Sequence, residues 1–215
     1  HIMLVDEINR ATTKTQSALL EAMEELHVTV DGESYELPRP FLLLATQNPI
    51  DFEGTYVLPE AQLDRFMFKF SLGYPDAAAE KTMAVQQSRV HPLETIEPVA
   101  DIEFVRHMQL KAREIHVDDA VTEYGIDIAR RTREHASVFL GASPRATLAL
   151  LQAAKAYAFL HEREYVTPDD IKYLTPYILG HRLLLHAEAR LSGDKPNSVL
   201  QSVLEQVRVP VRLER

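Results

Sequence analysis

Two short, uninterrupted apolar runs constrain the first third of this 215-residue chain more than any other feature. One run covers residues 2–5, the other covers residues 41–45, and polar residues follow both. Continuous apolar runs of this length are typical of strands that are buried on both faces, as in a parallel sheet. A helix must connect two such strands, so the pattern predicts an α/β unit.

Three further patterns refine this unit. Thr13 and Gln16 have the spacing of a capping box and precede apolar residues at helical intervals, which predicts a helix between the two strands. Residues 28–37 flank a central Asp31-Gly32 pair, which is a typical two-residue turn of a β-hairpin. Residues 67–72 are a third strand candidate.

The pattern changes after Pro75. Hydroxyl caps before proline at Ser143-Pro144 and Thr167-Pro168 mark two helix starts. Charge divides at the same place, because residues 1–75 hold 5 Lys/Arg and 12 Asp/Glu, net −7, whereas residues 76–215 hold 18 and 20, net −2. We therefore expect two units, an α/β unit over 1–75 and an all-helical unit over 76–215. The predicted helices cover roughly 77–90, 101–114, 119–138, 144–162, 168–186 and 196–208.

Composition excludes several classes of function. The net charge of −9 argues against a general nucleic-acid binder, which needs a surplus of Lys and Arg on one face. The chain has no Cys, so disulfides and thiolate catalysis are excluded, and no apolar run approaches the ~20 residues that cross a bilayer. The nine His residues lack metal-binding spacing, and no G-x-S-x-G elbow supports a serine hydrolase.

Polar side chains follow both predicted buried strands. Asp6-Glu7 follows the first strand, and Asn48 follows the second. Ligands of open α/β sheets bind at the carboxyl ends of the strands, where one acid can hold Mg²⁺, the next can activate a water, and an amide can orient it. The alternative is that Asp6-Glu7 is a solvated acidic pair and that Asn48 is a turn residue before Pro49.

Two arginines are candidates for anion binding. Arg65 lies between a short helix and a strand candidate, where an ion pair with the adjacent Asp64 is the alternative and would contribute little. Arg145 lies just inside the helix start after Ser143, where a cation is electrostatically unfavourable. An anion can offset that cost, or the side chain can simply be exposed.

In combination, these segments resemble the MoxR family of AAA+ ATPases over nearly the whole chain. The second unit also contains VTPDD at 166–170 and GHRL at 180–183, which match later helices of that family's lid. The other matching segments correspond, in order, to the Walker B strand, its following helix, sensor 1, the arginine-finger segment and sensor 2. They are IMLVDEINRA at 2–11, KTQSALLEAME at 14–24, ATQNP at 45–49, LPEAQLDRF at 58–66 and GASPRA at 141–146.

The resemblance implies an ATP- and Mg²⁺-dependent site. It assigns Asp6 to Mg²⁺, Glu7 to activation of the hydrolytic water and Asn48 to orientation of that water. Arg65 would act in trans on a neighbouring subunit, and Arg145 would reach the phosphates from the lid. Arginine suits both positions because it stays charged and grips phosphate oxygens bidentately. The hairpin at 28–37 resembles an insertion that can face the ring pore.

One departure from the family pattern is decisive for activity. The phosphate-binding loop G-x-x-x-x-G-K-[ST] does not occur in these 215 residues, and the family's sheet order, 5-1-4-3-2, is represented only by strands 3, 4 and 5. The chain also starts inside an apolar run, so we expect a fragment that does not hydrolyse ATP alone. A strand over 67–72 would lack its neighbour. Either the first unit is therefore disordered or rebuilt, for example by strand exchange between chains, or the missing residues exist elsewhere. The fold class is thus a partial AAA+ core with an incomplete parallel sheet, followed by a helical lid.

The resemblance implies a hexameric ring with chaperone-like remodelling of protein complexes, often beside a partner with a von Willebrand A domain. It also implies a cytoplasmic location, with no nucleic acid and no membrane span. A magnesium-chelatase-like or helicase-like AAA+ motor shares the motif order. The alternative from another class is a non-catalytic assembly module that retains only remnants of these motifs.

Overall fold

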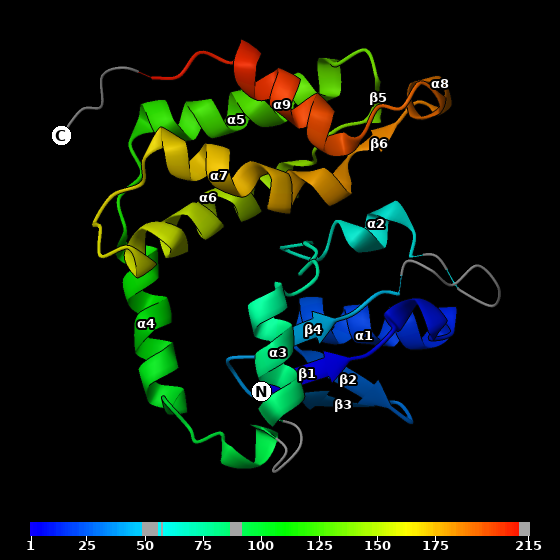
Figure 1. The fold of residues 1–215 in the computed structure, drawn as a ribbon, viewed down its shortest axis with the longest axis vertical. Helices are drawn as coiled ribbons and strands as arrows, with labels where there is room; N and C mark the ends of the chain where they lie inside the picture. Colours follow the sequence, from blue (N-terminus) through cyan, green and yellow to red (C-terminus); the bar gives the residue numbers. More distant parts are fainter. Residues whose placement is uncertain (49–55, 57, 87–91, 211–215) are drawn as a thin grey trace.

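The computed structural model describes residues 1–48, 56, 58–86 and 92–210 (Figure 1). Strands β1 (Ile2–Val5) and β4 (Leu42–Ala45) form a parallel pair with Ile2 opposite Leu42 and Val5 opposite Ala45. Helix α1 (Thr13–Glu25) lies between them in sequence, as a parallel connection requires. Both predicted strands and the helix are confirmed. The cap, however, is Thr12, whose hydroxyl accepts the Thr15 N–H, one residue before the predicted Thr13.

The predicted hairpin is also present. Strands β2 (His27–Val30) and β3 (Glu33–Glu36) pair antiparallel around Asp31 and Gly32. Both turn residues have positive φ, 51° and 85°, which is the geometry that an Asp-Gly turn of a two-residue hairpin needs.

The third strand candidate, residues 67–72, is wrong. This segment forms no strand, and its backbone contact is with the helical unit, where the Lys69 N–H donates to the Tyr177 carbonyl at 3.0 Å. Phe70 is 65% exposed and Leu72 is 92% exposed. A strand is stable only where a neighbouring strand pairs with its backbone, and none lies beside this segment in the described part of the chain. The wider expectation of a disordered or rebuilt first unit stays a prediction.

The remainder of the described chain is mostly helical. Its shorter elements are 3-10 turns at Ile8–Arg10, Pro92–Thr95 and Gly180–Arg182, and strands β5 (Val138–Leu140) and β6 (Leu184–Leu185). The α-helices are α2 (Glu60–Leu63), α3 (Ala77–Gln86), α4 (Ile102–Glu114), α5 (Asp119–Glu134), α6 (Pro144–Leu160), α7 (Pro168–Leu179), α8 (Ala187–Leu191) and α9 (Pro196–Gln206).

Most of the predicted helices and both hydroxyl caps are confirmed. Ser143 accepts the Ala146 N–H, and Thr167 with Asp170 forms a complete capping box. The helices predicted over 119–138 and 168–186 are too long. They end at Glu134 and Leu179, and the residues beyond them form the antiparallel β5–β6 pair, so the second unit is not purely helical.

The apolar core lies in the helical unit. Every residue of the main buried apolar cluster lies between Ile115 and Val207, mostly on α5, α6, α7, α9 and the β5–β6 pair and otherwise in the segments that connect them. Figure 1 shows these helices stacked in one body, with the β1–β4 sheet, α1 and the hairpin forming another and α2 lying between the two. No helix in the described ranges is long and apolar enough to span a membrane. The division into units at residue 75 stays a prediction.

Candidate functional site

The ends of β1 and β4 bring three of the predicted residues together. Because Val5 lies opposite Ala45, the next residues of both strands meet: Thr46 Oγ donates to Asp6 Oδ1 and accepts the Glu7 N–H at 2.9 Å. Asn48 Nδ2 donates to Glu7 Oε1 at 3.4 Å. Thr46, which holds both acids, was not among the predicted site residues, although its position directly after a predicted strand could have indicated it.

The turn after β1 is strained and tightly held. Glu7 has φ 49° and ψ 54°, a left-handed conformation that is uncommon for any residue other than glycine. Arg10 Nε lies 2.8 Å from Glu7 Oε2. The fully buried Gln16 donates through Nε2 to the carbonyls of Ile8, at 3.1 Å, and Tyr56, at 3.0 Å. Gln16 therefore fixes this turn beside the first turn of α1, rather than capping the helix.

The donor set suits a magnesium ion that is held partly by its substrate. Asp6 is exposed and offers a carboxylate at the strand end, and carboxylate oxygens are hard donors that Mg²⁺ prefers. No group of three potential metal ligands occurs among the described residues. Magnesium is usually held by one or two carboxylates together with phosphate oxygens, so one exposed acid fits this arrangement better than an all-protein cage.

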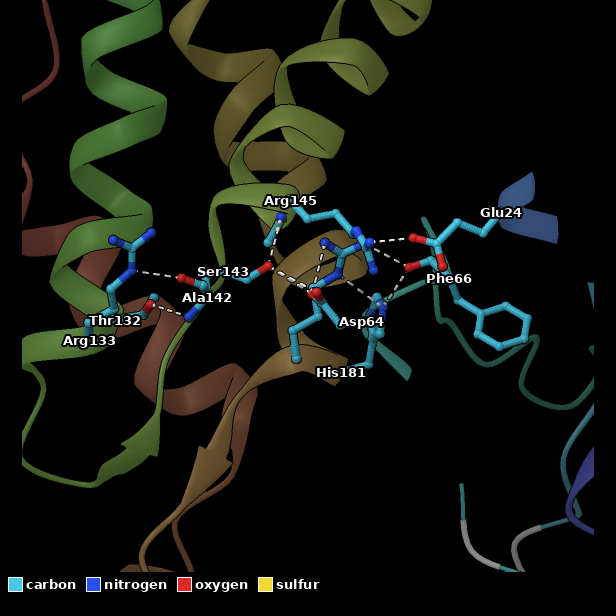
Figure 2. Close-up of polar contacts among 11 residues, drawn as sticks. Glu24, Asp64, Phe66, Thr132, Arg133, Ala142, Ser143, Arg145 and His181 are labelled. Carbon is cyan, nitrogen blue, oxygen red and sulfur yellow. Dashed lines mark hydrogen bonds and ion pairs between the residues drawn. The ribbon is translucent and has the colours of Figure 1, made fainter. Parts of the chain in front are cut away.

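The two predicted arginines meet elsewhere, on one carboxylate. Arg65 Nη1 pairs with Glu24 Oε2. Arg145 Nη2 lies 2.5 Å from Glu24 Oε1 (Figure 2). The anion that offsets the position of Arg145 at a helix start is therefore Glu24. The alternative, an Asp64–Arg65 ion pair, is not seen: Arg65 pairs with Glu24, and Arg182 lies 3.3 Å from Asp64. Glu24 was not among the predicted site residues, because nothing in the sequence distinguishes it from the neighbouring acids of the same helix.

Helix α1 separates these two groups. Gln16, which holds the Asp6–Glu7 turn, lies in the first helical turn, whereas Glu24 lies eight residues later, in the last turn. At 1.5 Å per residue this is about 12 Å along the helix axis. The structure thus brings Asp6, Glu7 and Asn48 together, brings Arg65 and Arg145 together, and keeps the two groups apart.

A partly buried polar cluster next to the arginines joins α2 to the helical unit. We call Asp64, Ser143, His181, Arg182 and the Phe66 carbonyl the junction cluster. Ser143 Oγ donates to the Asp64 carboxylate, 3.0 Å from each oxygen, and the Phe66 carbonyl accepts from Arg182 Nη2 at 2.8 Å and from His181 Nε2 at 3.0 Å.

Burial shifts the titration of both basic members of the junction cluster. It lowers the pKa of His181 to about 4, so the ring is neutral at pH 7 and its Nε2–H is the donor to Phe66. Burial also lowers the pKa of Arg182, against the opposing effect of Asp64. Arginine nevertheless stays charged at pH 7, so the Arg182–Asp64 ion pair persists.

The loop that presents Arg145 is fixed by close packing. Thr132 Oγ accepts the Ala142 N–H at 2.9 Å, and Arg133 Nε donates to the Ala142 carbonyl at 2.7 Å (Figure 2). A Cβ atom at Gly141 would lie 2.7 Å from the Arg133 backbone, so only glycine fits. This packing determines where α6 begins and hence where Arg145 points.

Comparisons with known proteins agree with the motif order. The family model described as the ATPase family associated with various cellular activities (AAA) matches residues 1–68, and the AAA lid domain model matches residues 130–203. Chaperone MoxR1 of Mycobacterium tuberculosis is 38% identical over 219 residues, which cover 98% of this chain and 58% of that protein. The chain belongs to the MoxR family of AAA+ ATPases.

Two further proteins are similar to almost the whole chain. The uncharacterized protein YeaC of Bacillus subtilis is 50% identical over 212 residues, covering 99% of this chain and 66% of YeaC. A crystal structure of a Cytophaga hutchinsonii protein, provisionally described as an ATPase, superposes with a TM-score of 0.91 at 36% identity and covers 97% of this chain and 66% of that one.

The chain spans about two thirds or less of the length of the curated relatives that it matches. The predicted fold class, a partial α/β AAA+ core with an incomplete parallel sheet followed by a helical lid, is confirmed. We refer below to residues 1–75 as the core segment and to the helical unit as the lid.

Proposed function

We propose that the full-length protein hydrolyses ATP as a hexameric MoxR-type ring and uses the energy to remodel or mature protein complexes. The observation that carries this proposal is the division of the predicted site into two groups, one at each end of α1. Neither group suffices for hydrolysis alone. A ring in which each subunit contributes its arginines to a neighbour's acidic residues would bring the two groups together.

The acidic group supplies the hydrolytic functions. Asp6 would hold Mg²⁺, which neutralises charge on the nucleotide phosphates. Glu7 would accept a proton from the attacking water, and the Asn48 amide, which donates a hydrogen bond to Glu7, would orient that water. The strained backbone of Glu7 supports this role, because conformations of this kind concentrate at functional sites.

The arginine group supplies charge in trans. Arg65 and Arg145 converge on one carboxylate, so their guanidinium groups lie close enough together to bind one phosphate group. Since α1 separates them from Glu7 of the same chain, we assign both to the nucleotide of the neighbouring subunit. Arginines in such positions are worth about 10³–10⁵ in rate in well-studied NTPases.

We propose the partners of the ring from the family resemblance. Client protein complexes and a partner with a von Willebrand A domain fit a chaperone-like motor in the cytoplasm. The 215-residue chain alone should not hydrolyse ATP, because it lacks the phosphate-binding loop. By itself it would behave as a non-catalytic assembly module, which is the alternative hypothesis from the sequence.

Substitution of Glu7 tests the hydrolytic assignment in the full-length protein. Glu7→Gln should retain ATP binding but reduce steady-state turnover by about 10²–10⁴-fold, because the amide cannot accept the proton. A coupled phosphate-release assay and equilibrium binding of labelled ATP measure the two effects. Unchanged turnover would remove Glu7 from this role.

Subunit mixing tests the arginine assignment. Arg65→Ala rings should be inactive, whereas rings mixed with Glu7→Gln subunits should regain turnover, because an intact arginine and an intact glutamate then meet at some interfaces. Activity as a function of mixing ratio is the measurement. Failure to regain turnover at any ratio would show that Arg65 does not act between subunits.

A further inference from the structure

We propose that Glu24 is a latch: its carboxylate occupies the position between Arg65 and Arg145 that a nucleotide phosphate takes in the working ring. This inference rests on the proposed function, which assigns both arginines to phosphate. It goes beyond that function by giving Glu24 a role: the Glu24 carboxylate competes with the nucleotide phosphate for Arg65 and Arg145. In the latched state the core segment and the lid are tied together and both arginines are occupied.

The chemistry of the contact supports substitution by phosphate. Glu24 accepts from Arg65 with one carboxylate oxygen and from Arg145 with the other, which is how two arginines share the oxygens of one phosphate. Arg145 is the second residue of α6, at the positive end of the helix dipole, so this position favours an anion whichever group provides it.

The latch is accessible enough to exchange. The side chains of Arg65, Arg145 and Glu24 are 35%, 49% and 31% exposed, so water and small anions reach all three. Ion pairs with this degree of exposure are weak, because solvent screens them. A phosphate group with more than one negative charge can therefore displace a single carboxylate.

The junction cluster behaves differently and explains why the latch can open without separating the two units. The Arg182 side chain is 2% exposed; it donates a hydrogen bond to the Phe66 carbonyl and forms an ion pair with Asp64. Removing either partner would leave a buried polar group unsatisfied, which is costly. The junction cluster therefore anchors the lid to the core segment, while the Glu24 contacts exchange beside it.

Titration with inorganic pyrophosphate tests the latch without any need for turnover. In low salt, isothermal titration calorimetry of the 215-residue chain should show Glu24→Gln binding pyrophosphate about three- to tenfold more tightly than the parent, because the competing carboxylate is neutralised. Glu25→Gln is the matched control. It makes the same change of charge at the next residue, whose side chain pairs with no arginine in the described structure, and it should stay within about twofold of the parent.

Arginine variants locate the added affinity. Glu24→Gln combined with Arg145→Gln should lose the gain, and the same should hold with Arg65→Gln. Thermal unfolding of each variant, followed by circular dichroism, confirms that the lid stays folded. Equal affinities of Glu24→Gln and the parent, an equal gain in Glu25→Gln, or no pyrophosphate binding by any of the three would overturn the latch.

The outcomes separate this inference from the proposed function. If the arginine variants weaken pyrophosphate binding and Glu24→Gln leaves it unchanged, the arginines bind phosphate and only the latch fails. The Glu7→Gln turnover assay in the full-length protein does not involve Glu24, so a failure of the proposed hydrolytic role would appear there and not in the titration.

Discussion

The core segment and the lid differ in how completely they bury their apolar side chains. In the lid, residues from α5, α6, α7 and α9 bury one another in a continuous apolar cluster. In the core segment, Ile2 and Leu4 on β1 are 72% and 67% exposed, and a two-stranded sheet leaves both edges open. The lid therefore contains an apolar core that can stabilise it, whereas the core segment buries only a few apolar side chains, such as Ile8, Leu20 and Leu43, and leaves much of its sheet exposed.

Paired Leu→Ala substitutions test this difference most strongly. Leu150→Ala in α6 removes a fully buried side chain and should lower the free energy of unfolding by about 2–5 kcal/mol. Leu4→Ala in β1 removes a largely exposed one and should change it by less than about 0.5 kcal/mol. Urea unfolding followed by circular dichroism at 222 nm measures both. Comparable losses would mean that the sheet has a core of its own.

Glycine substitutions sharpen the comparison within the lid. Gly141→Ala forces a methyl group against the Arg133 backbone at 2.7 Å and should destabilise the lid by about 1–3 kcal/mol. Gly125→Ala is the control, because its methyl group would meet only the flexible end of Leu151, at 3.3 Å, and alanine favours the helix. Thermal unfolding distinguishes them. A neutral Gly141→Ala would show that the loop before Arg145 adapts freely.

The last prediction concerns how lowering the pH affects the junction cluster. Burial lowers the folded pKa of His181 to about 4, below the unfolded value of about 6.5, so the unfolded state binds more protons between these values. The stability that neutral His181 contributes is therefore present above about pH 6.5 and is lost as pH falls toward about 4. Contacts between core segment and lid should weaken over this range while the lid stays helical.

Hydrogen exchange of the Lys69 and Phe66 amides from pH 7 to pH 4.5, corrected for intrinsic exchange rates, measures that weakening. His181→Gln keeps a donor for the Phe66 carbonyl without titrating and should flatten the pH dependence. His107→Gln, on the exposed face of α4, should leave it unchanged. A pH dependence that persists in His181→Gln would assign it to another group.

Local signals in the sequence were sufficient where a segment is stabilised by its neighbours along the chain. The caps at Ser143 and Thr167, the Asp31-Gly32 turn and the helical stripes all depend on such contacts, and they were predicted correctly. The strand over 67–72 failed for the opposite reason, because a strand depends on a partner that its own residues do not specify. The β5–β6 pair was missed because its strands lie more than forty residues apart.

The residues of the candidate site likewise fall into those whose contacts could be predicted from the sequence and those whose contacts could not. The meeting of Asp6, Glu7 and Asn48 could be predicted, because parallel strands end at one edge of a sheet. The meeting of Arg65 and Arg145 on Glu24 could not, because three side chains from α1, α6 and the segment after α2 are brought together only by the packing of core segment and lid. Roles for all these residues stay proposals.

The Ser143 hydroxyl makes two hydrogen bonds at once, and this restricts which residues can occupy position 143. One hydroxyl accepts the Ala146 N–H at the start of α6 and donates to Asp64 across the junction. Aspartate, a good helix cap, would face the Asp64 carboxylate with a second negative charge, and alanine would lose both bonds. Serine and threonine meet both requirements, with asparagine as the remaining candidate. The start of α6 and the attachment of the lid to the core segment therefore depend on the same small set of residue types at position 143.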